Sequence, residues 1–107
     1  MSEYLSIRED VLRKLEANLP EIRERFGIET LGIFGSVSRG EDTPDSDVDI
    51  LYDFQQGKGN MHSFSHFTEY IEDLLGRTAD FVSLKWATPQ FRHYVEKDMI
   101  LLGDSSA

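Results

Sequence analysis

The spacing of hydrophobic residues predicts helix at the start of the chain. Over residues 4–26, apolar side chains recur every three or four positions among charged ones, as in one amphipathic helix or two. Pro20 fits the first turn of a second helix better than the middle of a long one, and the break would then fall at Asn18 or Leu19. Gly27 is the expected end of this helical segment, because glycine commonly terminates helices.

Three later segments have the composition of β-strands. Glu29–Phe34 is short, β-prone and bounded by glycine, which is typical of a buried strand. Ser46–Phe54 alternates apolar residues with aspartates, so we expect a second strand with one buried face. Thr78–Leu84 is the third expected strand. The short link after the first strand begins with a tight turn over residues 35–40 and favours an antiparallel first pair.

Helical spacing returns twice in the second half of the chain. Residues 64–75 form an expected helix that ends at a glycine, and Pro89 begins a final helix. A short apolar segment, Met99–Leu102, follows it. Residues 41–45 and 55–60 have the composition of loops.

This order of elements predicts an α/β fold of the α+β kind, with a small mixed β-sheet of about three strands flanked by helices. A chain of 107 residues suits one domain, here 1–107. Within it we expect N-terminal helices over about residues 4–26, a core over 29–102 and a polar tail over 103–107.

The charge balance is strongly acidic, with 20 acidic against 11 basic residues and a net charge of −9. Such a surface repels a phosphate backbone, so we expect no direct nucleic-acid binding. It favours solubility first and is also compatible with a basic protein partner. The hydrophobic fraction of 39% is that of a globular protein with a packed core.

The chain has no cysteine, which excludes disulfides and thiolate sites and fits a reducing cytoplasm. Its first residues lack the basic start and apolar run of a signal peptide. No segment approaches the ~20 apolar residues of a membrane span. We therefore expect a cytoplasmic protein that does not enter membranes, and the sequence leaves homo-oligomerisation open.

Two aspartates on the second expected strand carry the candidate chemistry. Asp47 and Asp49 are two residues apart, so their side chains point to the same face of a strand, with origins roughly 6 to 7 Å apart. Val48 and Ile50 would anchor the opposite face in the core. Mg²⁺ is the natural partner of such a pair, because it is usually held by one or two carboxylates plus substrate phosphates.

A glycine and a serine follow the first expected strand directly. Gly35 lets the backbone approach a phosphate, and the Ser36 hydroxyl and neighbouring amides are donors for it. Because the link to Asp47 is short, phosphate donors and metal ligands should lie at neighbouring strand ends. The two elements would form one site.

The two segments Gly35-Ser36-Val37-Ser38-Arg39-Gly40 and Ser46-Asp47-Val48-Asp49-Ile50-Leu51 resemble the signature of minimal nucleotidyltransferases in the DNA polymerase beta-like superfamily. The resemblance extends to Ala79-Asp80-Phe81-Val82 and spans roughly Ile7 to Leu102. It implies a polymerase-beta-like fold and a Mg²⁺-dependent enzyme that uses ATP.

The resemblance also implies roles for three aspartates. Asp47 and Asp49 would bind two Mg²⁺ ions, and Asp80 on the next strand would complete the metal site and act as base toward the attacking hydroxyl. From the residues alone, Asp80 is equally well explained as a strand-end cap. The implied catalytic and metal-binding set is therefore Asp47, Asp49 and Asp80.

Nucleotide binding would fall to the glycine-rich segment. By the same comparison Gly35 and Ser36 would hold the β- and γ-phosphates of ATP, and Arg39 would assist or fix the turn. The implied chemistry is in-line attack on the α-phosphorus, in which one metal activates the nucleophile and the other stabilises the departing pyrophosphate.

The resemblance to the minimal family further implies an antitoxin paired with a HEPN-type ribonuclease toxin, which it would modify by transferring AMP from ATP to a tyrosine hydroxyl. An acidic surface suits docking to a basic, RNA-binding toxin. Two alternatives stay open. One is an antitoxin that acts by binding alone, and the other is a nucleotidyltransferase for small, aminoglycoside-like acceptors, which would be expected to carry a further helical domain.

Several polar residues outside the signature are interpreted as structural or solvent-exposed. Asp53 lies about 13 Å along the strand from Asp49, too far for the same ion, and is expected at the surface. The acidic segment 41–45 is expected to be an exposed loop. Trp86 is interpreted as a packing residue, and His62 and His66 as a surface pair. 

Overall fold

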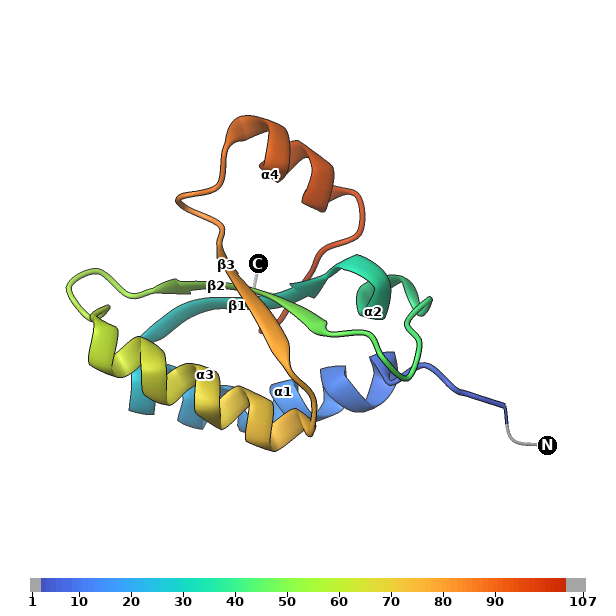
Figure 1. The fold of residues 1–107 in the computed structure, drawn as a ribbon. Helices are drawn as coiled ribbons and strands as arrows, with labels where there is room; N and C mark the ends of the chain where they lie inside the picture. The colour runs from blue at the N-terminus through green and yellow to red at the C-terminus, as the bar shows by residue number, and fades with distance from the viewer. Residues whose placement is uncertain (1–2, 104–107) are drawn as a thin grey trace.

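The computed structural model describes residues 3–103, in which a single four-stranded sheet is the central feature (Figure 1). The elements follow in the order α1 (Arg8–Phe26), β1 (Ile28–Phe34), α2 (Gly35–Arg39), β2 (Val48–Phe54), α3 (Met61–Leu75), β3 (Ala79–Ser83), α4 (Pro89–Glu96) and β4 (Ile100–Leu101). The expected α/β architecture is confirmed. The apolar segment near residue 100 adds a short fourth strand to the three expected.

The sheet is mixed, with strand order β3-β2-β1-β4. β1 pairs antiparallel with both β2 and β4, whereas β2 and β3 run parallel. α3 connects the two parallel strands, as such a crossover requires. α1 and α3 cover one face of the sheet, and the shorter α4 stands over the other (Figure 1).

The main core lies between the sheet and the pair α1 and α3. Its helical side consists of apolar residues at helical spacing: Val11, Leu15, Leu19, Ile22 and Phe26 from α1, and Phe67, Ile71 and Leu75 from α3. A smaller cluster under α4 is built around Phe34, Leu51 and Val95. Because this second layer is thin, polar side chains share its face of the sheet with apolar ones.

α1 is one continuous helix, so the expected break at Asn18 or Leu19 does not occur. Pro20 is exposed, as is Glu16, whose carbonyl loses its helical partner there and is open to water. The buried stripe of α1 continues on both sides of the proline, and its packing against the sheet outweighs the cost of the missing hydrogen bond. Gly27 ends the helix in the left-handed conformation, as expected.

No helix among residues 3–103 is long and apolar enough to cross a membrane. The expected polar tail falls, apart from Gly103, outside the residues that the structure describes.

Candidate active site

The glycine-rich segment after β1 forms a single turn of helix, α2, instead of the expected tight turn. Gly35 begins it with φ at +78°, and Gly40 ends it in the left-handed conformation. The Ser38 hydroxyl donates to the Gly35 carbonyl at 2.8 Å, which closes the turn from within. Gly35 and Ser36 are both half-buried, so the start of α2 lies at the edge of the core.

Gly35 lies directly against the second aspartate of β2. Phe34 is the register partner of Asp49, and a β-carbon at Gly35 would lie 2.2 Å from the Asp49 Oδ2 atom. A side chain has no room at this position, and glycine also meets the positive φ without strain. The structure thus brings the Gly35-Ser36 segment and Asp49 together, as the short link between them predicts.

The third aspartate lies opposite the second. Asp49 and Asp80 are register partners on the parallel strands β2 and β3, and both stand on the face of the sheet that α4 partly covers. Asp47 immediately precedes β2 and does not lie on it, which corrects the expected strand over residues 46–54. It is exposed and accepts a hydrogen bond from the Thr78 hydroxyl. All three aspartates therefore gather at the same ends of two adjacent strands.

The three carboxylates interact electrostatically. Burial raises the pKa of Asp49 to about 6, with further contributions from the charges of Asp80 and Asp47. Arg39 acts in the opposite direction and favours the ionised form of Asp49. A cluster of like charges with a raised pKa is typical of a site that holds a cation or transfers protons.

Arg39 lies at the rim of this cluster and is fixed by two carboxylates. Its Nε donates to Glu41 Oε1 at 2.9 Å, and its Nη1 donates to Asp98 Oδ2 at 2.5 Å. Hydrogen bonds to Glu41 and then to Asp98 raise the pKa of Arg39, which therefore stays charged. Sequence reasoning missed Asp98, because no motif or periodicity connects it with a residue 59 positions away.

Comparison with protein families gives the decisive match. The model of the family described as "Polymerase beta, Nucleotidyltransferase" matches residues 17–107, most of the chain. The chain belongs to this nucleotidyltransferase family. The expectation from the two signature segments is thereby confirmed, and the protein is an enzyme of the nucleotidyltransferase type.

Three relatives show how near the match is. A protein adenylyltransferase, MntA, from Thermococcus cleftensis is 46% identical over 74 residues, which are 69% of this chain and 74% of that protein. A solved structure provisionally described as a minimal nucleotidyltransferase is 32% identical, with a TM-score of 0.71 over 85% of this chain and 92% of that one. A chain in the complex of tri-AMPylated Shewanella oneidensis HEPN toxin with MNT antitoxin shares the fold, with 15% identity and a TM-score of 0.61 over 89% of this chain and 74% of that one.

The donor set of this nucleotidyltransferase fits a hard divalent cation. Asp47, Asp49 and Asp80 supply only oxygen ligands, and a cation would offset both the burial of Asp49 and its repulsion by Asp80 and Asp47, which together raise its pKa. Within residues 3–103, no three His, Cys, Asp or Glu side chains already converge on one metal position. Asp47 is held by Thr78, so its carboxylate would have to turn toward the other two.

Asp49→Asn should stabilise the free nucleotidyltransferase at neutral pH without divalent cations. A carboxyl whose pKa is raised in the folded state lowers the free energy of unfolding when it is ionised. This loss of stability is complete above the folded pKa of about 6 and vanishes below the unfolded pKa of about 3.9. At about pH 7.5 we expect a gain of about 1–2 kcal/mol, smaller than the full shift because solvent screens the half-buried group. Urea unfolding of wild type and Asp49→Asn at about pH 7.5 and pH 4 measures the difference in stability above and below the pKa of Asp49. Equal stabilities of the two proteins at the higher pH would contradict the prediction.

The loop before β2 is anchored by a buried aspartate, which corrects the expectation of an exposed acidic loop. Asp42 is only 6% exposed and accepts hydrogen bonds from the hydroxyls of Tyr4 and Ser6 and from the Ile7 amide. Burial by itself raises the pKa of Asp42, but these hydrogen bonds outweigh it and lower the pKa below its ordinary value. The segment before α1 thus fixes the loop that leads to Asp47.

Arg77 holds the other end of the same loop. Its guanidinium donates to the carbonyls of Thr43 and Ser46 at 3.2 and 2.9 Å, and to the Tyr4 hydroxyl at 2.9 Å. Ser46 directly precedes Asp47, so Arg77 fixes the backbone at the first aspartate of the site. Nothing in the sequence pattern marks this role, because the acceptors are main-chain carbonyls.

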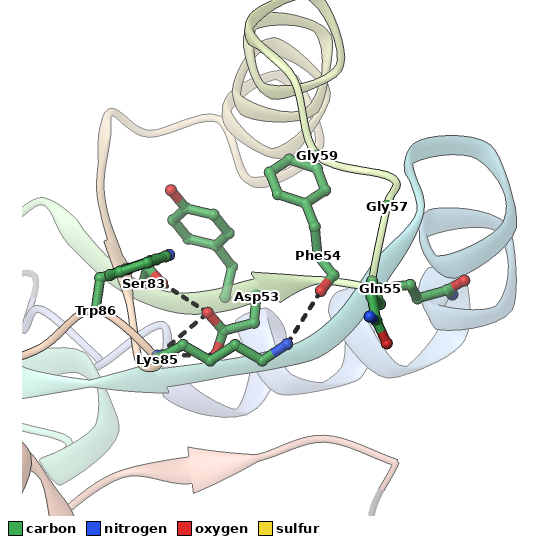
Figure 2. A pocket seen from close by; sticks show the side chains of 10 residues that line it. Asp53, Phe54, Gln55, Gly57, Gly59, Ser83, Lys85 and Trp86 are labelled. Atoms are coloured by element: carbon green, nitrogen blue, oxygen red, sulfur yellow. Dashed lines mark hydrogen bonds between the residues drawn. The ribbon is translucent and has the colours of Figure 1, made fainter.

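Asp53 is buried, which corrects the expectation of a surface residue. It is 4% exposed and accepts hydrogen bonds from the Ser83 hydroxyl at 2.6 Å and the Lys85 amide at 3.2 Å. It lines a cavity of about 430 Å³ at the ends of β2 and β3 (Figure 2), and it lies near the end of β2 opposite to Asp47. Trp86, at the edge of this cavity, is 88% exposed and is not the expected packing residue.

His62 and His66 are exposed on α3, as expected for a surface pair. Their ring centroids are 4.3 Å apart.

Proposed function

We propose that this nucleotidyltransferase transfers AMP from ATP to a hydroxyl of a partner protein, namely a tyrosine of a HEPN-type ribonuclease toxin, and so acts as its antitoxin. The observation that carries the proposal is the placement of Asp49 between the glycine that begins α2 and the opposing Asp80. The name of the Thermococcus cleftensis relative supports the adenylyl group and a protein acceptor. The fold shared with a chain of a HEPN toxin–antitoxin complex supports the kind of partner.

The roles of the residues follow from their positions. Asp47, Asp49 and Asp80 would hold Mg²⁺, which when bound neutralises phosphate charge and acidifies the attacking hydroxyl. The Ser36 hydroxyl and the amides that begin α2 would donate to the β- and γ-phosphates. Arg39, at the rim, adds a fixed positive charge beside them.

The transfer itself is a substitution at phosphorus. The tyrosyl oxygen forms a bond to the α-phosphorus while the bond from that phosphorus to the bridging oxygen breaks and pyrophosphate leaves. The hydroxyl proton passes to a carboxylate, for which Asp80 is placed best, because it is exposed at the open edge of the sheet. Most of the acceleration would come from positioning and charge neutralisation.

The acidity of the chain suits a basic acceptor. With a net charge of −9, the enzyme is attracted to a cationic RNA-binding protein and repelled by free RNA. The acceptor protein would supply its own docking surface beside the site.

The test combines the purified protein with a HEPN-type protein from the same genome, [α-³²P]ATP and Mg²⁺. We expect label on the partner protein and, in its intact mass, a gain of one or more AMP units. Phenylalanine in place of the modified tyrosine should remove the label. If the partner is neutralised but never labelled, the protein acts by binding alone; label on an aminoglycoside-like compound instead would show a small-molecule enzyme.

Asp80→Asn should lower the rate of AMP transfer by at least about a hundredfold, because general-base assistance typically contributes that much or more. ATP affinity should change far less, since Asp47, Asp49 and the phosphate donors remain. Single-turnover transfer rates and ATP titrations by calorimetry separate the two. Asp73→Asn makes the same chemical change on the exposed side of α3 and serves as the control. An unchanged transfer rate in Asp80→Asn would remove this residue from the reaction.

A further inference from the structure

Asp98 reaches the active site from the far end of the chain. It lies between α4 and β4, and its Oδ2 accepts the hydrogen bond from Arg39 Nη1 at 2.5 Å. The Asp98 side chain is only 16% exposed. Among the described residues, its Oδ1 is buried without any hydrogen-bond partner. Arg39 is therefore the cation that compensates this carboxylate.

Of the two carboxylates that form ion pairs with Arg39, Asp98 restrains the guanidinium more strongly. The Glu41 side chain is 67% exposed, so solvent screens its ion pair and its flexibility weakens the geometry. Asp98 is shielded and fixed by the chain on both sides, since its own amide and that of Met99 donate to the Val95 carbonyl. The direction of the guanidinium is thus set mainly by Asp98.

A carboxylate at the position of Asp98 costs stability, because it lies near other acidic side chains and is partly buried; its ion pair with Arg39 offsets that cost. Arg39 ends the single-turn helix α2, which begins at Gly35 against Asp49, and Asp98 is bonded to Arg39, so both groups lie beside the carboxylate cluster. A buried oxygen without a donor also costs stability. The two bonds to Arg39 use Nε and Nη1, which leaves the Nη2 hydrogens for a further acceptor such as a phosphate oxygen.

We propose that Asp98 is a positioning residue that aims the Arg39 guanidinium at the triphosphate of the bound nucleotide. The inference rests on the proposed function, because it needs a nucleotide at the site. Asp98 lies outside both signature segments, residues 35–40 and 46–51, so the proposal assigns a role that the signature does not include. An Arg39–Asp98 ion pair that only joined α4 to α2 would stabilise the fold, but it would have no specific effect on ATP binding.

The test measures transfer kinetics of Asp98→Asn, Arg39→Gln and the double variant. Asp98→Asn should raise the KM for ATP about five- to tenfold and leave the KM for the acceptor protein unchanged. In the Arg39→Gln background the same change should have little further effect, since the residue acts through Arg39. Glu41→Gln should have a smaller effect, and Glu96→Gln, exposed at the end of α4, none.

The outcomes separate the two proposals. If wild-type protein neither binds ATP nor transfers AMP, the proposed function fails. If wild-type transfers AMP but Asp98→Asn leaves the KM for ATP unchanged, or its effect adds fully to that of Arg39→Gln, the role of Asp98 is overturned. Should Asp98→Asn fold poorly by circular dichroism, Asp98→Glu takes its place. It keeps the charge but moves the carboxylate by one methylene, so it should raise the KM for ATP in the wild-type background and have little effect in the Arg39→Gln background.

Discussion

Replacing Asp47 and Asp49 together by asparagine should reduce AMP transfer by at least about a thousandfold. The change keeps the shape of both side chains and removes the charges that would hold Mg²⁺, an ion worth several kcal/mol of transition-state stabilisation. The strands themselves should not suffer, because Asp47 is exposed and loss of the Asp49 charge relieves repulsion. Single-turnover transfer of [α-³²P]AMP to the partner protein measures the loss.

A matched control has the same two substitutions at exposed positions outside the cluster, Asp45→Asn and Asp73→Asn. It should transfer AMP at the wild-type rate. The double active-site variant should also lose the ability to neutralise the toxin in growing cells. If it still neutralises the toxin fully while transfer is abolished, complex formation suffices, and the antitoxin acts by binding.

Gly35→Ala should lower transfer by about a hundredfold, the typical cost of misplacing a catalytic group by roughly 1 Å. A methyl group at Gly35 would meet Asp49 Oδ2 at 2.2 Å, so the carboxylate must move away from the start of α2. The backbone there has φ +78°, which adds strain for any residue with a β-carbon. Transfer kinetics, together with urea unfolding, would show activity falling much further than stability.

Gly76→Ala separates the two causes. Its φ of +69° is similar, but a β-carbon there would have nothing within 4 Å. We expect a loss of about 1–2 kcal/mol of stability from backbone strain and wild-type transfer. Equal losses of activity in both variants would mean that the contact of Gly35 with Asp49 is not important for the site.

The part of the site that lies within short segments could be predicted from the sequence. Gly35 and Asp49 lie at adjoining ends of β1 and β2, and the short link between these strands places them near each other. Asp47 precedes β2, so strand alternation does not set the direction of its side chain. Asp80 is different, because only the resemblance singled it out. Its register with Asp49 depends on a parallel pairing across α3, which no local pattern specifies.

The residues that sequence reasoning missed or misplaced act across long separations. Asp42 and Asp53 look like surface acids in a polar context, yet each is buried because donors from other segments meet it. Arg77 and Asp98 were not marked at all, since their partners lie 31 and 59 positions away along the chain. Such pairings depend on tertiary packing, and composition gives no sign of them.

The parallel pairing of β2 with β3 has a consequence for folding kinetics. β1 and β2 can meet early, because they are close in sequence, but Asp80 reaches Asp49 only after the α3 crossover has closed a long loop. During refolding, helix signals should therefore appear before the proposed metal and nucleotide site is assembled. Recovery of ligand binding would report a late step of assembly, which makes the carboxylate cluster a built-in probe of long-range strand pairing.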